Sequence, residues 1–269
     1  MKAVLFDAVE TLIRPWPSVG SVYARAAAGH GLRCPARALQ AAFHPAYTEL
    51  FPERFFGSSG LQTSEPRERR WWARVVARTF ERAGCGTPGA AVIAAGLAAF
   101  ARGDAWRPCA GAVETLRTLK ARSLKIALVS NFDGRLHRVV AEMELLSFFD
   151  AVIVSSETGW AKPSPRIYAA ALAALGVEPG EALMVGDRPK EDVAGATQAG
   201  LKALLYDPRG RAPGPGSIRD LRQVPGRVTA FYNILKNPER VANAAAPPCA
   251  GRESCGHRRP SAAPPRNRG

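Results

Sequence analysis

A carboxylate, a hydroxyl next to an amide, an ammonium and a second carboxylate each lie shortly after an apolar run of the sequence. These side chains belong to Asp7, Ser130-Asn131, Lys162 and Asp187. A carboxylate can attack phosphorus or carbon and form a covalent intermediate. A neighbouring ammonium and hydroxyl suit the binding of a phosphoryl group. The residue types therefore predict a nucleophile, Asp7, among anion-binding groups; an Asp that caps a turn or a helix is the simpler alternative.

A second pair of carboxylates lies near the end of this pattern. Asp187 and Asp192 are five residues apart, at a predicted junction between a strand and a helix. A few oxygen ligands, completed by water and a substrate phosphate, suit Mg²⁺. We therefore predict a magnesium site here, with capping of the following helix as the alternative role of Asp192. Thr11 has two interpretations, because its hydroxyl can fix the loop after Asp7 or cap a helix.

Parallel strands would bring these residues together. Short apolar runs typical of buried parallel strands occur at residues 2–6, 125–129, 151–154, 182–185 and 202–206. Helical patterns follow at residues 112–122, 135–143, 164–175 and 190–199. This alternation predicts an α/β fold with a doubly wound, Rossmann-like parallel sheet. Ligands bind such sheets at the carboxyl ends of the strands, where Asp7, Ser130 and Asp187 fall.

Residues 19–100 interrupt this alternation with a helical pattern. Helices are predicted at residues 22–29, 35–47, 67–83 and 90–101, with a loop at 51–64. Six residues at helical spacing are expected to form its core: Trp71, Trp72, Val75, Val76, Thr79 and Phe80. We predict an α/β core at residues 1–18 and 101–240, an inserted α-helical cap domain at 19–100, and a disordered basic tail at 241–269. Candidate anion contacts in the cap are Arg54, Arg67, Arg69 and Arg70.

The composition limits the classes of partner. Lys and Arg outnumber Asp and Glu by 37 to 23, but no RNA-binding signature or zinc-finger spacing accompanies the net charge of +14, which argues against nucleic acid. A positive field still attracts phosphorylated anions. No apolar run is long enough to span a membrane and the start does not resemble a signal peptide, so a cytoplasmic location is expected. The cysteines predict neither a disulfide framework nor a zinc site: Cys34, Cys85, Cys109, Cys249 and Cys255.

Four segments of the chain resemble the four motifs of the haloacid dehalogenase superfamily. They are Phe6-Asp7-Ala8-Val9-Glu10-Thr11-Leu12, Val129-Ser130-Asn131, Lys162-Pro163 and Gly186-Asp187 through Asp192. Residues 130–135 and 159–168 resemble subfamily I in particular, and the resemblance covers roughly residues 1–207. It implies a hydrolase with a helical cap inserted after the first motif, in agreement with the helical pattern of residues 19–100.

The resemblance implies roles for the residues around the substrate. Asp7 would be the nucleophile that forms an aspartyl-phosphate, and Lys162 the second catalytic residue. Ser130 and Asn131 would bind the phosphate of a small phosphorylated metabolite, and Thr11 would support the loop beside it. The implied activity is that of a Mg²⁺-dependent phosphatase.

The resemblance also implies the ligands of the magnesium ion. Asp187 would bind it directly, together with Asp7 and the backbone carbonyl of Val9. Asp192 would lie behind these ligands and orient water or Lys162.

Val9 departs from the pattern of the phosphatases that the chain resembles. They carry a second aspartate here, which protonates the leaving group and then activates water; losing such acid–base catalysis typically costs about 10²–10⁴-fold in rate. Acyl or aryl phosphates, which have good leaving groups, would be affected least. Three alternatives stay open: Glu10 replaces the missing acid, the chain binds a phosphorylated ligand with little turnover, or it is a 2-haloacid dehalogenase, since those relatives also lack the second aspartate. The metal-binding pattern at Asp187 and Asp192 argues against the dehalogenase.

Overall fold

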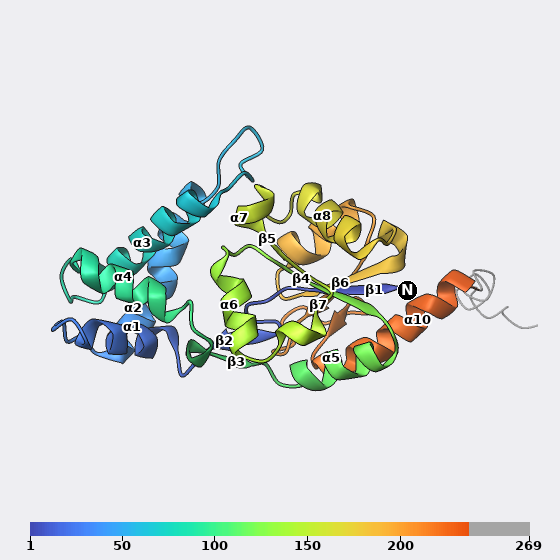
Figure 1. The fold of residues 1–269 in the computed structure, drawn as a ribbon, viewed down its shortest axis with the longest axis horizontal. Helices are drawn as coiled ribbons and strands as arrows, with labels where there is room; N and C mark the ends of the chain where they lie inside the picture. Colours follow the sequence, from blue (N-terminus) through green and yellow to red (C-terminus); the bar gives the residue numbers. More distant parts are fainter. Residues whose placement is uncertain (237–269) are drawn as a thin grey trace, which may run out of the picture. The chain divides into compact units, whose positions relative to one another are not determined.

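The computed structural model describes residues 1–236 and contains a six-stranded parallel sheet (Figure 1). The strand order β5–β4–β1–β6–β7–β8 confirms the predicted doubly wound α/β fold. The strands are β1 (Ala3–Phe6), β4 (Lys125–Ser130), β5 (Ala151–Val154), β6 (Ala182–Gly186), β7 (Lys202–Tyr206) and β8 (Ser217–Ile218). The edge strand β8, in which Ile218 pairs with Tyr206, was not among the strands predicted from the sequence. Two residues are too few to show the alternation that marks a strand.

Helices cover both faces of the sheet, because alternate residues of each strand point to opposite sides. Val4 and Phe6 of β1 pack in one apolar core with residues of α5, α6 and α10. Ala3 and Leu5 pack in a second core with residues of α8 and α9. These helices are α5 (Ala112–Ala121), α6 (Arg135–Glu142), α8 (Pro165–Leu175), α9 (Gly195–Gln198) and α10 (Val224–Lys236). Burial on both sides accounts for the unbroken apolar runs of the central strands.

The central strand β1 determines where the polar residues meet. Its last residue, Phe6, lies opposite Leu128 of β4 and Val185 of β6. Since the three strands run parallel, the residues that follow them emerge at the same edge of the sheet. Asp7 and Asp187 are therefore neighbours, although they are 180 positions apart in the sequence.

Four helices lie between two short strands, β2 (Ile13–Pro15) and β3 (Trp106–Pro108), which pair antiparallel. The helices are α1 (Val19–Ala28), α2 (Ala36–Leu50), α3 (Glu65–Arg82) and α4 (Ala90–Ala99). We call residues 19–99 the helical insert. Its core includes Tyr23, Leu39 and Phe80. Of the six residues predicted to form this core, five are buried, whereas Trp72 is half-buried and lines a cavity.

Cys34 and Cys85 form a disulfide in the helical insert, with their Cα atoms 5.9 Å apart. The expectation that the cysteines form no disulfide is therefore wrong for this pair. Cys34 precedes α2 and Cys85 follows α3, and these two helices pack against each other. The pairing depends on that packing and leaves no local spacing motif in the sequence. Cys109 is a buried free thiol.

The predicted tail at residues 241–269, with its two cysteines, lies outside the described residues. Among residues 1–236, no helix combines the length and the apolar character needed to cross a membrane.

Candidate active site

The ammonium of Lys162 is the centre of the site. Its Nζ donates to Asp7 Oδ1 and to Asp192 Oδ1, each at 2.6 Å, and to the carbonyl oxygen of Val129 at 2.9 Å. The Ser130 hydroxyl donates to Asp7 Oδ1 at 3.4 Å. The structure thus brings together residues that the sequence separates by up to 185 positions. These three acceptors fix the orientation of the ammonium and direct one of its N–H groups at the Asp7 carboxylate.

Burial and the neighbouring charges shift the pKa values of Asp7 and Lys162 in opposite directions. Burial raises the pKa of Asp7 to about 6, although Lys162 lowers it, and Asp192 adds a further increase. Burial also disfavours the charge of Lys162, but the carboxylates of Asp192 and Asp7 outweigh it and raise the pKa of the ammonium above its usual value. Lys162 is therefore charged whenever its partners are ionised. Such a group can neutralise an anion bound at Asp7.

Three carboxylates lie close enough to share a cation. Ligand atoms of Asp7, Asp187 and Asp192 lie within 4.8 Å of one another. Burial, followed by repulsion from Asp7 and Asp192, raises the pKa of Asp187 to about 7. Asp187 Oδ1 is buried and has no hydrogen-bond partner among the described residues. A hard cation such as Mg²⁺ would satisfy that oxygen and relieve the repulsion, so the donor set fits one.

Asp192 supports this cluster from behind. Its Oδ1 accepts from Lys162, and its Oδ2 accepts the backbone N–H of Arg188 at 2.9 Å. Both oxygens are thus occupied, in contrast to Asp187 Oδ1. The carboxylate packs directly on Gly186, where an added Cβ would collide with it. Residues 190–199, predicted as one helix, begin as a π-helix (Pro189–Ala194) that continues into α9, and π-helical turns are frequent at functional sites.

Asn131 holds Lys162 in place. The Asn131 Oδ1 accepts the Lys162 N–H at 2.6 Å, and its Nδ2 donates to the Lys162 carbonyl at 2.9 Å. Asn131 lines the cavity, but its amide is engaged with the backbone rather than directed at a ligand. Thr11 is fully buried, and it neither lines the cavity nor finds a partner for its hydroxyl among residues 1–236.

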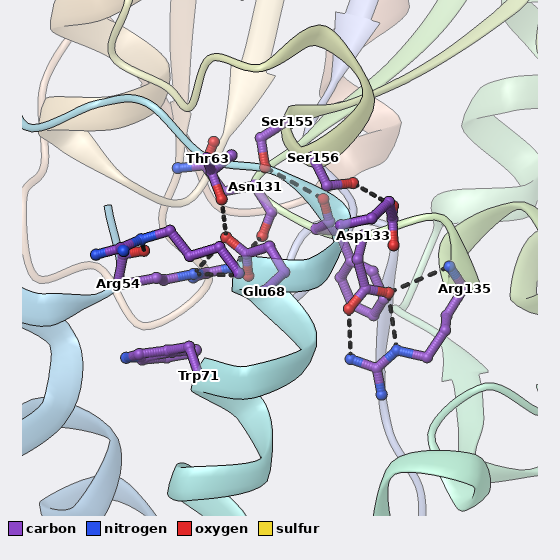
Figure 2. A network of polar contacts seen from close by, with 12 residues as sticks. Arg54, Thr63, Glu68, Trp71, Asn131, Asp133, Arg135, Ser155 and Ser156 are labelled. Atoms are coloured by element: carbon purple, nitrogen blue, oxygen red, sulfur yellow. Dashed lines mark hydrogen bonds and ion pairs between the residues drawn. The ribbon is translucent and has the colours of Figure 1, made fainter. Parts of the chain in front are cut away.

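A buried ion pair joins the helical insert to Asn131 (Figure 2). Arg54 and Glu68 contact at 3.0 Å with almost no exposure, and the Thr63 hydroxyl donates to Glu68 at 2.9 Å. The Arg54 guanidinium lies flat over the Trp71 ring, 4.7 Å from its centroid. Its Nη2 donates to the Asn131 carbonyl at 2.7 Å. Each guanidinium nitrogen of Arg54 donates to a protein group, so Arg54 has a structural role in place of the anion contact expected from the sequence.

The other candidate arginines of the insert are also not anion contacts. Arg67 donates to backbone carbonyls, including that of Arg54 at 2.7 Å. Arg69 and Arg70 are exposed and do not line the cavity. The arginines that do line it, besides Arg54, are Arg14, Arg135, Arg188, Arg209 and Arg211. Because Arg188 directly follows Asp187 in the sequence, its position near the site could have been predicted.

A second contact joins the insert to the α/β core. The Glu65 carboxylate accepts the backbone N–H of Gly134 at 2.6 Å and the hydroxyl of Ser156. Gly134 precedes α6, and Ser156 belongs to the short helix α7 (Ser155–Thr158). Next to it, Arg135 pairs with Asp133 at 2.7 Å (Figure 2). Arg135 also donates to the Leu97 carbonyl of α4 at 3.0 Å. The insert is therefore anchored to the loop after β4 at several points.

A cavity of about 1120 Å³ gives access to the site. Asp7, Ser130, Lys162 and Asp187 lie in its wall, as do Val9 and Glu10. One face of α2 and the residue after it supply an aromatic part of the wall that was not predicted from the sequence. Phe43, Tyr47 and Phe51 recur at intervals of four residues, a pattern that marks one side of a helix.

Comparisons with known proteins agree with this geometry. A family model described as "haloacid dehalogenase-like hydrolase" matches residues 1–200. The bovine haloacid dehalogenase-like hydrolase domain-containing protein 3 is 37% identical over 210 residues, which are 76% of this chain and 81% of that protein. The human protein of that name is 36% identical over the same shares. The predicted resemblance to the haloacid dehalogenase superfamily is thereby confirmed.

Two further similarities cover different parts of the chain. A phosphoserine phosphatase of Thermus thermophilus is 41% identical over 108 residues, 40% of this chain and 43% of that protein. The structure of L-2-haloacid dehalogenase from Xanthobacter autotrophicus matches with a TM-score of 0.66 and 24% identity, over 85% of this chain and 98% of that one. This likeness shows the shared fold. With the motif residues gathered at the sheet edge and the family model matched over 200 positions, the chain belongs to the haloacid dehalogenase-like hydrolases.

Proposed function

We propose that this chain is a Mg²⁺-dependent phosphatase that acts on a small phosphorylated metabolite through an aspartyl-phosphate at Asp7. The observation that carries the proposal is the position of Lys162 Nζ, 2.6 Å from both Asp7 and Asp192, beside the partnerless oxygen of Asp187. This places one nucleophilic carboxylate next to a fixed positive charge and a pair of acids suited to a cation. The phosphatase among the relatives supports the same reaction class.

In the proposed reaction each step is assigned to a residue of the chain. A carboxylate oxygen of Asp7 attacks phosphorus, the ester P–O bond breaks, and the leaving oxygen takes its proton from water. Lys162 neutralises charge that builds up on the phosphoryl oxygens, and the Ser130 hydroxyl donates to one of them. Water then cleaves the aspartyl-phosphate and restores Asp7. Val9 supplies no proton at either step.

The residues available to hold Mg²⁺ are Asp7, the backbone carbonyl of Val9 and Asp187. When bound, the ion would supply positive charge beside the phosphoryl group. Asp192, whose oxygens accept from Lys162 and Arg188, would keep Lys162 oriented.

Residues 19–100 would act as the cap of this enzyme, over the core of residues 1–18 and 101–240. The cavity has walls from both parts, including Tyr47 of α2 and Asp7 of the core. A cap in this position would exclude water and select the substrate.

A second candidate function follows from Val9. A chain with this site and no acid–base residue at position 9 would bind a phosphorylated ligand and turn it over slowly, since general acid–base catalysis is worth about 10²–10⁴-fold. Chloride release from a 2-haloacid without metal would point instead to a dehalogenase.

The test is a panel of phosphate esters, assayed for phosphate release with and without Mg²⁺. We expect wild-type activity that requires the ion and disappears in Asp7→Asn. The surface variant Asp104→Asn, which removes a carboxylate 59% exposed, is the matched control and keeps wild-type activity. An inactive wild type with activity gained in Val9→Asp would favour the binding protein over the phosphatase.

A further inference from the structure

Four aromatic side chains of the helical insert form a continuous wall inside the cavity. Phe43, Tyr47, Phe51 and Trp72 all line it, and each is half-buried. Tyr47 is at the centre, with its ring centroid 6.1 Å from Phe43, 5.6 Å from Phe51 and 6.0 Å from Trp72. We call these four residues the aromatic wall. Aromatic groups that stay partly exposed within a large cavity are typical of a surface that binds a ligand.

The aromatic wall lies next to the phosphate-binding side of the site. The Arg54 guanidinium lies 5.6 Å from the centre of the Trp72 ring and donates to the Tyr47 hydroxyl at 3.3 Å. The same guanidinium donates to the carbonyl of Asn131 at 2.7 Å. Asn131 follows Ser130, whose hydroxyl contacts Asp7. One arginine side chain therefore spans the distance from the wall to the loop that carries Ser130.

The wall also contains an unused hydrogen-bond donor. Trp72 Nε1 is shielded from solvent and has no partner among the residues that the structure describes. Other tryptophans of the chain do have one, for example Trp71, whose Nε1 donates to the Leu50 carbonyl at 2.8 Å. A buried donor left without a partner costs free energy unless a ligand or water accepts from it.

Val9 constrains the leaving group of any substrate on this wall. Without an acid at position 9, the leaving oxygen departs as an anion. A phenolate has a conjugate acid with a pKa of about 10, as in the tyrosine side chain. An alkoxide is closer in basicity to hydroxide, whose conjugate acid, water, is a far weaker acid than a phenol. Phenols are thus far better leaving groups here than sugars or other alkyl alcohols.

The geometry points to an aryl monophosphate, a phosphate ester of a phenol, as the substrate class, with its ring on the aromatic wall and its phosphoryl group at Asp7. This assignment rests on the proposed function. In the reaction an Asp7 oxygen forms the bond to phosphorus as the aryl P–O bond breaks. The phenolate leaves with the electron pair and takes a proton from water. A second water molecule then hydrolyses the aspartyl-phosphate and releases inorganic phosphate.

Ring recognition is tested by binding, without any turnover. Phenylphosphonate and methylphosphonate share the anionic group and differ in the ring. Calorimetry with the full chain and Mg²⁺ is expected to show phenylphosphonate binding about tenfold more tightly. Trp72→Ala should remove most of this preference. Phe43→Leu should also reduce it; this variant keeps an apolar residue and serves as the test if Trp72→Ala does not fold. Trp16→Ala, an exposed tryptophan outside the cavity, is the matched control and keeps the preference.

The leaving group is tested by comparing phenyl phosphate with benzyl phosphate, which carries the same ring on an alkyl oxygen. We expect wild-type kcat to be about a hundredfold higher on phenyl phosphate, and Val9→Asp to narrow the ratio. Equal binding of the two phosphonates, or equal kcat on the two esters, overturns the inference. If phenylphosphonate binds more tightly than methylphosphonate but no hydrolysis depends on Asp7, the aromatic wall is supported as a ring-binding surface. The proposed phosphatase function is overturned in that case.

Discussion

The Asn131 side-chain amide makes two hydrogen bonds to the backbone of Lys162: it accepts from the N–H at 2.6 Å and donates to the carbonyl at 2.9 Å. The same Asn131 receives Arg54 of the helical insert through its own carbonyl. The Lys162 ammonium is therefore positioned by a residue of the second motif and, one step further away, by the insert.

The first prediction concerns this amide. Asn131→Ala leaves the Lys162 N–H and carbonyl without their partners, which we expect to cost about 1–3 kcal/mol in the free energy of unfolding. Displacement of Lys162 should also lower kcat more than it raises KM. Urea unfolding and initial rates measure both effects. Asn131→Asp keeps the acceptor and loses the donor, so an effect as large as that of alanine would show that the acceptor contributes little.

The second prediction concerns the Lys162 ammonium. Lys162→Met leaves two buried carboxylates, Asp7 and Asp192, without their shared cation, and should destabilise the fold by about 3–5 kcal/mol. The double variant Lys162→Met/Asp192→Asn should recover part of this loss, as measured by chemical denaturation. Lys120→Met breaks a half-exposed pair with Asp150 and serves as the control with little expected effect. Equal destabilisation by Lys162→Met and Lys120→Met would contradict the role of the buried pair.

The third prediction concerns pH. The folded-state pKa of Asp187 is raised to about 7 and that of Asp7 to about 6, both above the unfolded values, so the folded state holds extra protons between roughly pH 4 and 7. Stability from these groups is present at low pH and is lost as the pH rises through 6 to 7. In metal-free buffer, Asp187→Asn should therefore raise Tm more at pH 8 than at pH 5.

Mg²⁺ should act in the same pH window. Because binding needs ionised carboxylates, the ion should raise the Tm of the wild type more at pH 8 than at pH 5. Asp187→Asn should lose this shift. A Tm increase that is the same at both values, or that survives in Asp187→Asn, would place the ion elsewhere.

The fourth prediction concerns the disulfide. Cys34 and Cys85 close a loop with a sequence separation of 51 residues, and their bond should stabilise the fold by about 2–4 kcal/mol. We expect Cys34→Ser/Cys85→Ser to lower Tm in non-reducing buffer and to match the wild type treated with reductant. A wild-type Tm that reductant leaves unchanged would count against the bond.

The parts of the site that lie at strand ends could be predicted from the sequence. The runs before Asp7 and Asp187 mark parallel strands, and parallel strands deliver the residues that follow them to one edge. Contacts that depend on tertiary packing could not be predicted from the sequence. Arg54 and Asn131 are 77 residues apart, and their bond joins a side chain to a backbone carbonyl, which leaves no trace in residue types.

Two other features that were not predicted, the disulfide and the aromatic wall, also depend on tertiary packing. The Cys34–Cys85 pair depends on how α2 and α3 pack. The aromatic wall was readable as a periodic pattern in Phe43, Tyr47 and Phe51, but an apolar helical face indicates burial in general and does not say whether protein or ligand covers it.

Two of the anchors between the insert and the core lie on a single turn of helix. Glu65 and Glu68 both belong to the first turn of α3; one holds Gly134, and the other holds Arg54, which in turn contacts Asn131. Fraying of that one turn would break both anchors together. Loss of these two contacts is therefore a local unwinding event, and amide hydrogen exchange at Glu68, whose N–H donates to the Ser64 carbonyl at 2.9 Å, reports its frequency.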